Sequence, residues 1–331
     1  MQLPRRQFLQ LGGAVAAATA AAASALPGRA WALDYPVRPV RLVVGFPAGG
    51  PSDILARLIA QWLAERLGQP FVVENQPGAA SNIATAAVVR APADGYTLLL
   101  VGPANAINAS LFDKLEFNFM TDIAPIAGLT REPLVMLVHP SVPARTGPEF
   151  LTYAKSNPGK IRLALTDPGS APHASGELFR MMTGIDLAVV HYTGGGPVAL
   201  KGTIEGQSEL MFEPLSASIE PLRAGKLRAL AVSTAMPSPA LPDLPVIGDF
   251  VPGFEASAVS GIGAPKNTQP EIIATLNAAI NAAFADPKMK ARLADTGGST
   301  LAGSPADFGR LMAQETEKWA KVVKFSAAKA R

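Results

Sequence analysis

The chain has 331 residues, of which 48% are hydrophobic and none is cysteine, so it can bury a sizeable core but forms no disulfide and no thiolate metal site. Three of its 29 basic side chains lie in residues 1–32, which hold no acidic one, and the remaining 26 balance the 26 acidic side chains. A neutral chain without a basic run is not expected to bind nucleic acid. The three histidines are far apart in sequence, so neither a metal site nor a cofactor is predicted.

Residues 1–32 have the pattern of an export signal. Arg5 and Arg6 form a twin-arginine pair, a run of small apolar residues follows over 11–26, and Ala30-Trp31-Ala32 fits a cleavage site. The alternative is an uncleaved membrane anchor, but the run is interrupted and only weakly apolar. We therefore expect a periplasmic protein that is cleaved near Ala32, with no transmembrane span in the mature chain.

The first glycine loop, residues 46–53, follows a β-branched run over 40–44 that predicts a buried strand. Apolar residues then recur at helical spacing as far as Leu67, and Gly68 supplies a stop. The helix start is expected to be capped by Ser52 or Asp53. Such a junction presents free amides and a positive dipole end to an anion, although a plain strand-to-helix turn would have the same pattern.

The same strand, loop and helix order then recurs along the chain. Loops over 77–82 and 102–105 are expected beside 46–53, at the carboxyl edge of a parallel sheet with helices on both faces. A second series has a loop over 166–173 and a three-glycine loop over 191–197. Three glycines in a row favour close backbone approach or a hinge, although a plain flexible loop would have the same pattern. In chain order, strands are predicted over 71–74, 97–101, 133–139, 161–165, 187–190, 210–213, 227–232 and 257–264, and helices over 82–90, 148–155, 174–182, 271–285 and 305–323.

Many short motifs, in order, resemble one family over essentially the whole mature chain. They lie at residues 36–41, 46–50 with Asp53, 67–69, 73–79, 94–98, 169–170 with His173, 206–207 with 211–212, 225–232 and 241–245. The chain is similar to the periplasmic solute receptors of tripartite tricarboxylate transporters, the Bug (TctC-like) family.

This resemblance implies an α/β fold of two doubly wound domains joined by a two-strand hinge, like the type II periplasmic binding proteins. The implied domains are 33–133 plus 258–331, and 134–257. The resemblance also implies a monomer that holds a small carboxylate in the cleft between them and passes it to the membrane components of the transporter. It implies no enzymatic activity.

The family's ligand contacts come from loops at strand ends, where backbone amides and water hold the carboxylates. Carried over to this sequence, they fall on Phe46, Ala48, Gly49, Asp53, Gly78, Ala79, Gly169, Ser170, His173, Tyr192, Gly194 and Pro197. The predicted edge of the sheet adds Ser52, Ala80, Pro103 and Asn105.

The second half departs from the family pattern at several positions near the expected site. Ala164-Leu165 replaces a Gly-Ser pair, Asp167 replaces a glycine, His191 a proline, Thr193 a basic residue and Val259 an aromatic residue. Asp167 places a carboxylate beside an anion site.

Because the candidate loops hold no Lys or Arg, we expect an anion that is bound without a salt bridge, with Arg57 paired to Asp53 instead. One competing function is a receptor of the same fold that signals to a sensor kinase. Another is a secreted hydrolase with Ser170 as nucleophile and His173 as base, which lacks a Gly-x-Ser-x-Gly elbow and a third member. Asp53 as a catalytic carboxylate lacks a partner at useful spacing.

Overall fold

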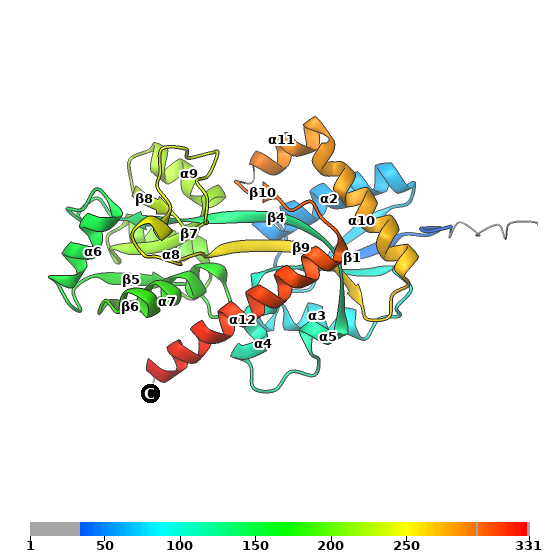
Figure 1. Ribbon diagram of the computed structural model, residues 1–331, viewed down its shortest axis with the longest axis horizontal. Helices are drawn as coiled ribbons and strands as arrows, with labels where there is room; N and C mark the ends of the chain where they lie inside the picture. The colour runs from blue at the N-terminus through cyan, green and yellow to red at the C-terminus, as the bar shows by residue number, and fades with distance from the viewer. Residues whose placement is uncertain (1–33, 296, 330–331) are drawn as a thin grey trace, which may run out of the picture. The chain divides into compact units, whose positions relative to one another are not determined.

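Short hydrophobic strands, separated by helices, pair into one long sheet in this computed structural model, which describes residues 34–295 and 297–329 (Figure 1). The described chain from Tyr35 onward is one compact unit. The predicted export signal over residues 1–32 lies outside the described residues. The strands are β1 (Val40–Val44), β2 (Phe71–Asn75), β3 (Thr97–Val101), β4 (Ile123–Val138), β5 (Arg162–Leu165), β6 (Ala188–His191), β7 (Leu210–Pro214), β8 (Arg228–Val232), β9 (Ser257–Pro265) and β10 (Ser299–Thr300).

Helices connect the strands and cover both faces of the sheet. They are α2 (Pro51–Leu67), α3 (Asn82–Val89), α4 (Pro103–Leu111), α5 (Phe119–Asp122), α6 (Gly147–Lys155), α7 (Ala171–Thr183), α8 (Gly196–Ile204), α9 (Leu215–Arg223), α10 (Pro270–Ala285), α11 (Pro287–Asp295) and α12 (Pro305–Lys329), with 3-10 turns η1 (Ala79–Ser81) and η2 (Ile247–Asp249).

The strand order is β2-β1-β3-β9-β4-β7-β5-β6, and β8 and β10 also pair with β4. Strands β1, β2 and β3 are parallel, and so are β5, β6 and β7. The carboxyl ends of parallel strands meet at one edge, so each group collects its βα loops there. The two groups are joined by β9 and β4, which run antiparallel to each other and to their neighbours.

Strand β4 has 16 residues and begins at Ile123, whereas the sequence predicted a strand only from residue 133. Its first part contains Pro125 and Gly128, which are unfavourable inside a strand. The pairing with β9 shifts register at both places, so these residues are accommodated as irregularities rather than as an end of the strand.

The core is divided by the sheet into layers. Helices α2, α10 and α11 pack on one face of β1, β3, β4 and β9, and α3 and α12 pack on the other. In the second group, α6 and α7 share a cluster with β5 and β7, while α8 and α9 cover the opposite face. Helices therefore cover both faces of each parallel group, as the doubly wound fold class predicts.

Helix α12 packs against α4 of the first group, against α7 of the second and against β4 (Figure 1). Trp319 is 1% exposed and donates a hydrogen bond of 2.9 Å from its indole N–H to Glu315. Burial of this aromatic residue in the same cluster as β5 and β7 attaches the closing helix to the second group.

Candidate functional site

The loop between β1 and α2 differs in one respect from its prediction. Helix α2 begins at Pro51, so its N-cap is Gly50, which has no side chain to cap the helix. Ser52 and Asp53 lie inside the first turn. Asp53 instead reaches back and accepts a hydrogen bond of 2.9 Å from the N–H of Gly49. Gly49 itself has φ +83°, a conformation that glycine adopts without strain.

Asp53 is the centre of a hydrogen-bond network that shapes this loop. It is 3% exposed and accepts from Arg57 Nε at 2.9 Å and from Asn75 Nδ2 at 3.0 Å. The same Asn75 amide donates to the carbonyl of Phe46, also at 3.0 Å. The bond from Arg57, with those from Gly49 and Asn75, lowers the pKa of Asp53 to about 2. The predicted pairing of Asp53 with Arg57 is confirmed, and Asp53 holds the loop through its own bonds.

The second loop, over 77–82, contains an unusual run of left-handed backbone. Ala79, Ala80 and Ser81 have φ of +46°, +50° and +75°, and Gly78 has φ +133°. Each non-glycine residue in this region costs of order 1 kcal/mol, so the surrounding structure must hold the run in place. Gly45 makes room for it, because a Cβ there would collide with the Ser81 side chain.

Asn108 on α4 is the main support of that run. Its Nδ2 donates to the carbonyl of Ala80 at 2.6 Å and to Asn82 Oδ1 at 3.0 Å. The side chain is 1% exposed, and its own Oδ1 has no hydrogen-bond partner among the described residues. The sequence did not single out Asn108, and no motif near it signals a role.

The third loop is shorter than predicted, because Pro103 already begins α4. Asn105 is 4% exposed; its Oδ1 accepts from the N–H of Gly102 and its Nδ2 donates to Thr85 Oγ1, both at 2.8 Å. Both ends of the Asn105 amide are therefore engaged inside the protein, and the side chain fixes the start of α4 as an N3 cap.

In the second group of loops, Ser170 is the N-cap of α7. Its Oγ accepts from the backbone N–H of His173 at 3.3 Å and bonds to the Thr166 hydroxyl at 2.6 Å. The contact of Ser170 with His173 is thus to the backbone and not to the imidazole that a serine nucleophile would need. Burial is the main cause that lowers the pKa of His173, so the ring is neutral at pH 7.

The two groups of loops face each other at Gly169. A Cβ added to this residue, which has φ +89°, would lie 2.9 Å from Asn108 Oδ1 and 3.3 Å from Ala80 Cβ. The loop after β5 thus approaches the strained loop before α3 and the side chain that supports it. This contact brings the predicted residues Ala80 and Gly169 together, although they are far apart in sequence.

The loop after β6 also opens a helix, which the sequence did not predict. Gly194 and Gly195 have φ of +104° and +82°, and Gly196 begins α8 with Pro197 in its first turn. Tyr192 is 8% exposed, packs over Gly202 and bonds to Ser208 at 3.4 Å, so its ring belongs to the core beneath the loop. The predicted contacts of this loop are therefore backbone groups at the start of α8.

The remaining predicted positions lie on the same loops. Phe46 is half-buried against the core that contains α2, Ala48, Gly78 and Ala79 are exposed, and Pro103 is half-buried in the first turn of α4. Three of the helices that these loops open, α2, α3 and α8, have no side-chain cap. Uncapped helix starts keep N–H groups for an external acceptor.

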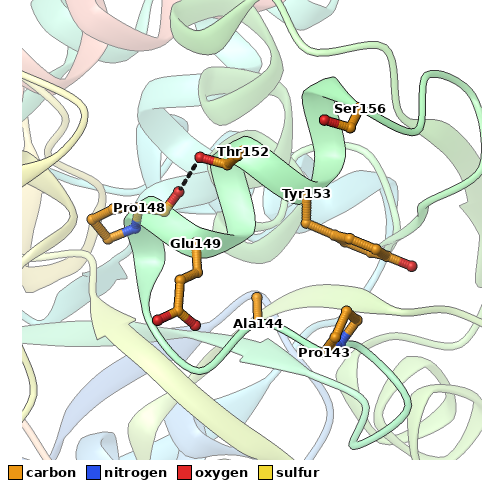
Figure 2. A pocket seen from close by; sticks show the side chains of 7 residues that line it. All are labelled: Pro143, Ala144, Pro148, Glu149, Thr152, Tyr153 and Ser156. Carbon is orange, nitrogen blue, oxygen red and sulfur yellow. Dashed lines mark hydrogen bonds between the residues drawn. The ribbon is translucent and has the colours of Figure 1, made fainter.

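A separate surface depression of about 560 Å³ runs along α6 (Figure 2). Its polar side chains include Glu149, which accepts from the N–H of Arg145 at 2.7 Å, and Thr152, which donates to the carbonyl of Pro148 at 3.0 Å. No predicted site residue lines it. Among the described residues no Lys or Arg lines it, and the start of α6 is capped by the Thr146 side chain, so it offers an anion neither a cation nor an uncapped helix start.

Cations on β4, α7 and α12 are already paired with carboxylates. Arg131 and Lys318 each contact Glu255 at 2.8 Å, and Lys318 also contacts Glu315 at 2.8 Å. On α7, Arg180 lies 2.7 Å from Glu177.

Within the described ranges, no helix combines the length and the apolar character that a membrane crossing requires.

Two groups of parallel strands, joined by the antiparallel strands β4 and β9, carry βα loops that face each other. This arrangement defines a solute-binding protein of the periplasmic-binding type. Solved structures agree: a Rhodopseudomonas palustris protein with adipate has a TM-score of 0.79 and 37% identity, covering 88% of this chain and 98% of its own. The periplasmic binding protein BugD has a TM-score of 0.75 and 32% identity, covering 88% of this chain and 98% of its own. MatC from Rhodopseudomonas palustris with bound malate has a TM-score of 0.74 and 33% identity, covering 87% and 100%.

The chain belongs to the tripartite tricarboxylate transporter receptor (TctC) family, whose sequence profile matches residues 55–327. BugT from Bordetella pertussis is 34% identical over 298 residues, which cover 89% of this chain and 91% of BugT. The resemblance seen in the sequence motifs is therefore confirmed. Members of this family are solute-binding receptors and not enzymes.

Proposed function

We propose that this protein captures a small carboxylate between its two groups of loops and delivers it to the membrane components of a tripartite tricarboxylate transporter. The main observation in support is the approach of Gly169, in a loop of the second group, to Asn108 and Ala80 of the first group. Helices that the loops of both groups open, α2, α3 and α8, have no side-chain cap. Relatives solved with adipate and with malate support a carboxylate as the ligand.

The proposed ligand is held without a salt bridge. Micromolar binding requires about 8 kcal/mol. Hydrogen bonds to a charged group contribute about 1.5–3 kcal/mol each, and a helix N-terminus contributes about 0.3–2 kcal/mol. Four or five amide contacts supply about 6–15 kcal/mol, a range that includes this value, and the cost of ordering the loops is subtracted from it.

We further propose the two domains implied by the family resemblance, 33–133 plus 258–331 and 134–257, in a periplasmic monomer. Two clusters of apolar side chains support this division: one lies wholly within 33–133 plus 258–331, and the other lies within 134–257 apart from residues of α4 and α12 that pack against it. The two segments that cross it belong to β4 and β9, which pair antiparallel, and this suits a hinge of paired strands.

The test is thermal unfolding of the protein, stripped of co-purified ligand, against a panel of acids that includes adipate and malate. A ligand at 100 times its dissociation constant adds about 2.7 kcal/mol, a shift of several degrees. The diamide of each acid is the matched control and should give no shift. Equal shifts by acid and diamide, or no shift by any acid, would contradict carboxylate capture.

Delivery has its own test. Deletion of the gene should abolish uptake of the stabilising acid, and restoration of the wild-type chain should recover it. Uptake that continues unchanged, with loss of a transcriptional response to the same acid, would instead favour a sensory receptor.

A further inference from the structure

Glu213, at the carboxyl end of β7, is a buried acid without a partner. The residue is 4% exposed, and no hydrogen bond from the described residues reaches its carboxyl group. Its Oε2 atom is fully buried. Buried carboxyl groups are normally paired or hydrogen-bonded, because an unsatisfied polar atom away from water costs a few kcal/mol. The sequence showed Glu213 only as part of a strand.

The position of Glu213 places it beneath the predicted second-group loops. Strand β7 is parallel to β5, which is parallel to β6, so the ends of all three strands lie at one edge. The carboxyl group lies against Gly196, where an added Cβ would be 3.0 Å from Oε2 and would collide with Oε1. Gly196 is the first residue of α8, whose N-cap, Gly195, provides no side-chain cap.

The charged groups around Glu213 do not neutralise it. On β4, Glu132 faces it, and Glu132 accepts from the N–H and the hydroxyl of Ser216, at 3.3 Å and 2.6 Å. On the loop after β5, Asp167 is exposed, and its Oδ2 would lie 3.9 Å from a Cβ on Gly195. The other cations on the neighbouring strands are paired elsewhere, Arg131 on β4 with Glu255 and Arg162 on β5 with Glu209. His191 on β6, the pair Lys201–Glu205 at α8 and the pair Arg223–Glu220 on α9 are exposed. His173, Glu177 and Arg180 lie on α7, which packs on the opposite face of β7 with Phe212.

Burial, and then the carboxylate of Glu132, raise the pKa of Glu213 to about 8. At neutral pH the group is therefore a neutral acid, with an O–H to donate and no acceptor in the described protein. A carboxylate oxygen is the strong acceptor that matches such a donor, and the resulting O–H···O⁻ bond is of the strong, charge-assisted kind.

We propose that Glu213, as the neutral acid, donates a hydrogen bond to the carboxylate of the bound ligand from beneath the start of α8. This inference rests on the proposed function, and it adds a specificity-determining residue to the same site. It assigns a carboxylate, rather than an ammonium group, to the part of the ligand that faces the second group of loops.

The experiment is calorimetric titration of the wild-type protein and three variants with adipate and with malate between pH 6.5 and pH 9.5. For the wild type we expect constant affinity up to about pH 7 and a loss of roughly tenfold per pH unit above about pH 8. Glu213→Gln keeps a donor that does not ionise, so it should bind within a few-fold of wild type at pH 7 and show no loss at high pH. Glu213→Leu should bind at least tenfold more weakly at every pH.

Glu220→Gln is the matched control, because Glu220 lies on the neighbouring helix α9 with an 84% exposed side chain. It should reproduce the wild-type pH profile. Near-ultraviolet circular dichroism of each variant establishes that the packing is intact before binding is compared.

Three results would overturn the inference. Wild-type affinity in Glu213→Leu would remove the residue from the site. An affinity that does not change with pH in the wild type would show that the protonated form of Glu213 takes no part in binding. An affinity that rises with pH would assign Glu213 as an ion partner of a cationic ligand group. Binding of an acid with any of these outcomes leaves the proposed function standing, whereas no binding of any acid at any pH overturns both.

Discussion

The Oδ2 atom of Asp53 accepts a hydrogen bond of 2.9 Å from the backbone N–H of Gly49, across the start of helix α2. This bond uses the amide that the glycine loop would otherwise offer to an anion. Asp53 therefore acts on the loop by fixing its shape, and the amides that remain for a ligand are those at the uncapped start of the helix.

Replacement of Asp53 by alanine should destabilise the protein and weaken carboxylate binding together. The change removes bonds from Gly49, Arg57 and Asn75 at a buried site, so we expect a loss of about 1–3 kcal/mol in the free energy of unfolding. Urea unfolding and calorimetry measure the two effects. Asp53→Asn keeps an acceptor for Gly49 and should recover part of both.

Glu116→Ala is the control for Asp53, because it removes a carboxylate whose side chain is 76% exposed and paired with Arg90. It should change neither quantity by more than about 0.5 kcal/mol. A ligand carboxylate bonded directly to Asp53 in a crystal structure would contradict the positioning role.

Gly49→Ala and Gly68→Ala form a matched pair at the two ends of the first loop and helix. Both glycines have positive φ, +83° and +73°, and an added Cβ meets no atom within 4 Å at either. The backbone cost, about 1 kcal/mol, should therefore be the same. Only Gly49 lies in the proposed site, so only its replacement should weaken binding, and Gly49→Val should abolish it. Equal affinities in the two alanine variants would exclude the loop from the site.

Gly169→Ala should weaken binding by separating the two groups of loops. The new Cβ would press on Asn108 and Ala80 at 2.9 Å and 3.3 Å, so the approach seen here would have to relax. Gly184→Ala is the control, since Gly184 also has positive φ, +63°, and open space around it. We expect a lower melting temperature for Gly169→Ala than for Gly184→Ala, because only the first has a close contact to relieve, and at least a tenfold lower affinity for Gly169→Ala. The prediction fails if the two bind alike.

The buried acid makes a prediction about stability that is separate from binding. The pKa of Glu213 is about 8 in the folded protein against an ordinary value of 4.5, so the folded state holds the proton more tightly. The stabilising contribution of Glu213 to the free energy of unfolding is complete below about pH 4.5. It is lost as the pH rises towards 8, at up to roughly 1.4 kcal/mol per pH unit. Chemical unfolding across pH 5–8 should show this slope in the wild type and a smaller one in Glu213→Gln.

Some of that slope should remain in Glu213→Gln, because burial also raises the pKa of Glu132. Glu220→Gln should keep the full wild-type slope. Identical slopes in the wild type and in Glu213→Gln would show that Glu213 does not titrate in this range.

The sequence predicted the parts of the fold that carry a local signal. The strand over 40–44, the end of α2 at Gly68 and the pair of Asp53 with Arg57 follow from hydrophobic spacing, a glycine stop and the i,i+4 relation. Helices α4, α5, α8, α9 and α11 were missed. Of these, α4 and α8 each begin at a Gly-Pro pair, which by itself is also typical of a loop.

The supporting side chains of the site could not be predicted, because they act across long separations. Asn108 supports Ala80 from another helix, and nothing in the residues beside it indicates that partner. Glu213 alternates with Phe212 along β7, a pattern that normally puts the polar residue in solvent. The packing of α8 and α9 over that face buries it.

Strand β9, Ser257–Pro265, lies between β3 and β4 in the sheet although β3 ends at Val101. During translation, the parallel strands β1, β2 and β3 are synthesised early, and one edge of β3 stays unpaired until β9 has been made. An open edge is a template for pairing with other chains. The nascent protein is therefore most exposed to aggregation from the synthesis of β3 until residue 265 has left the ribosome, and a chaperone that covers this edge would act in that interval.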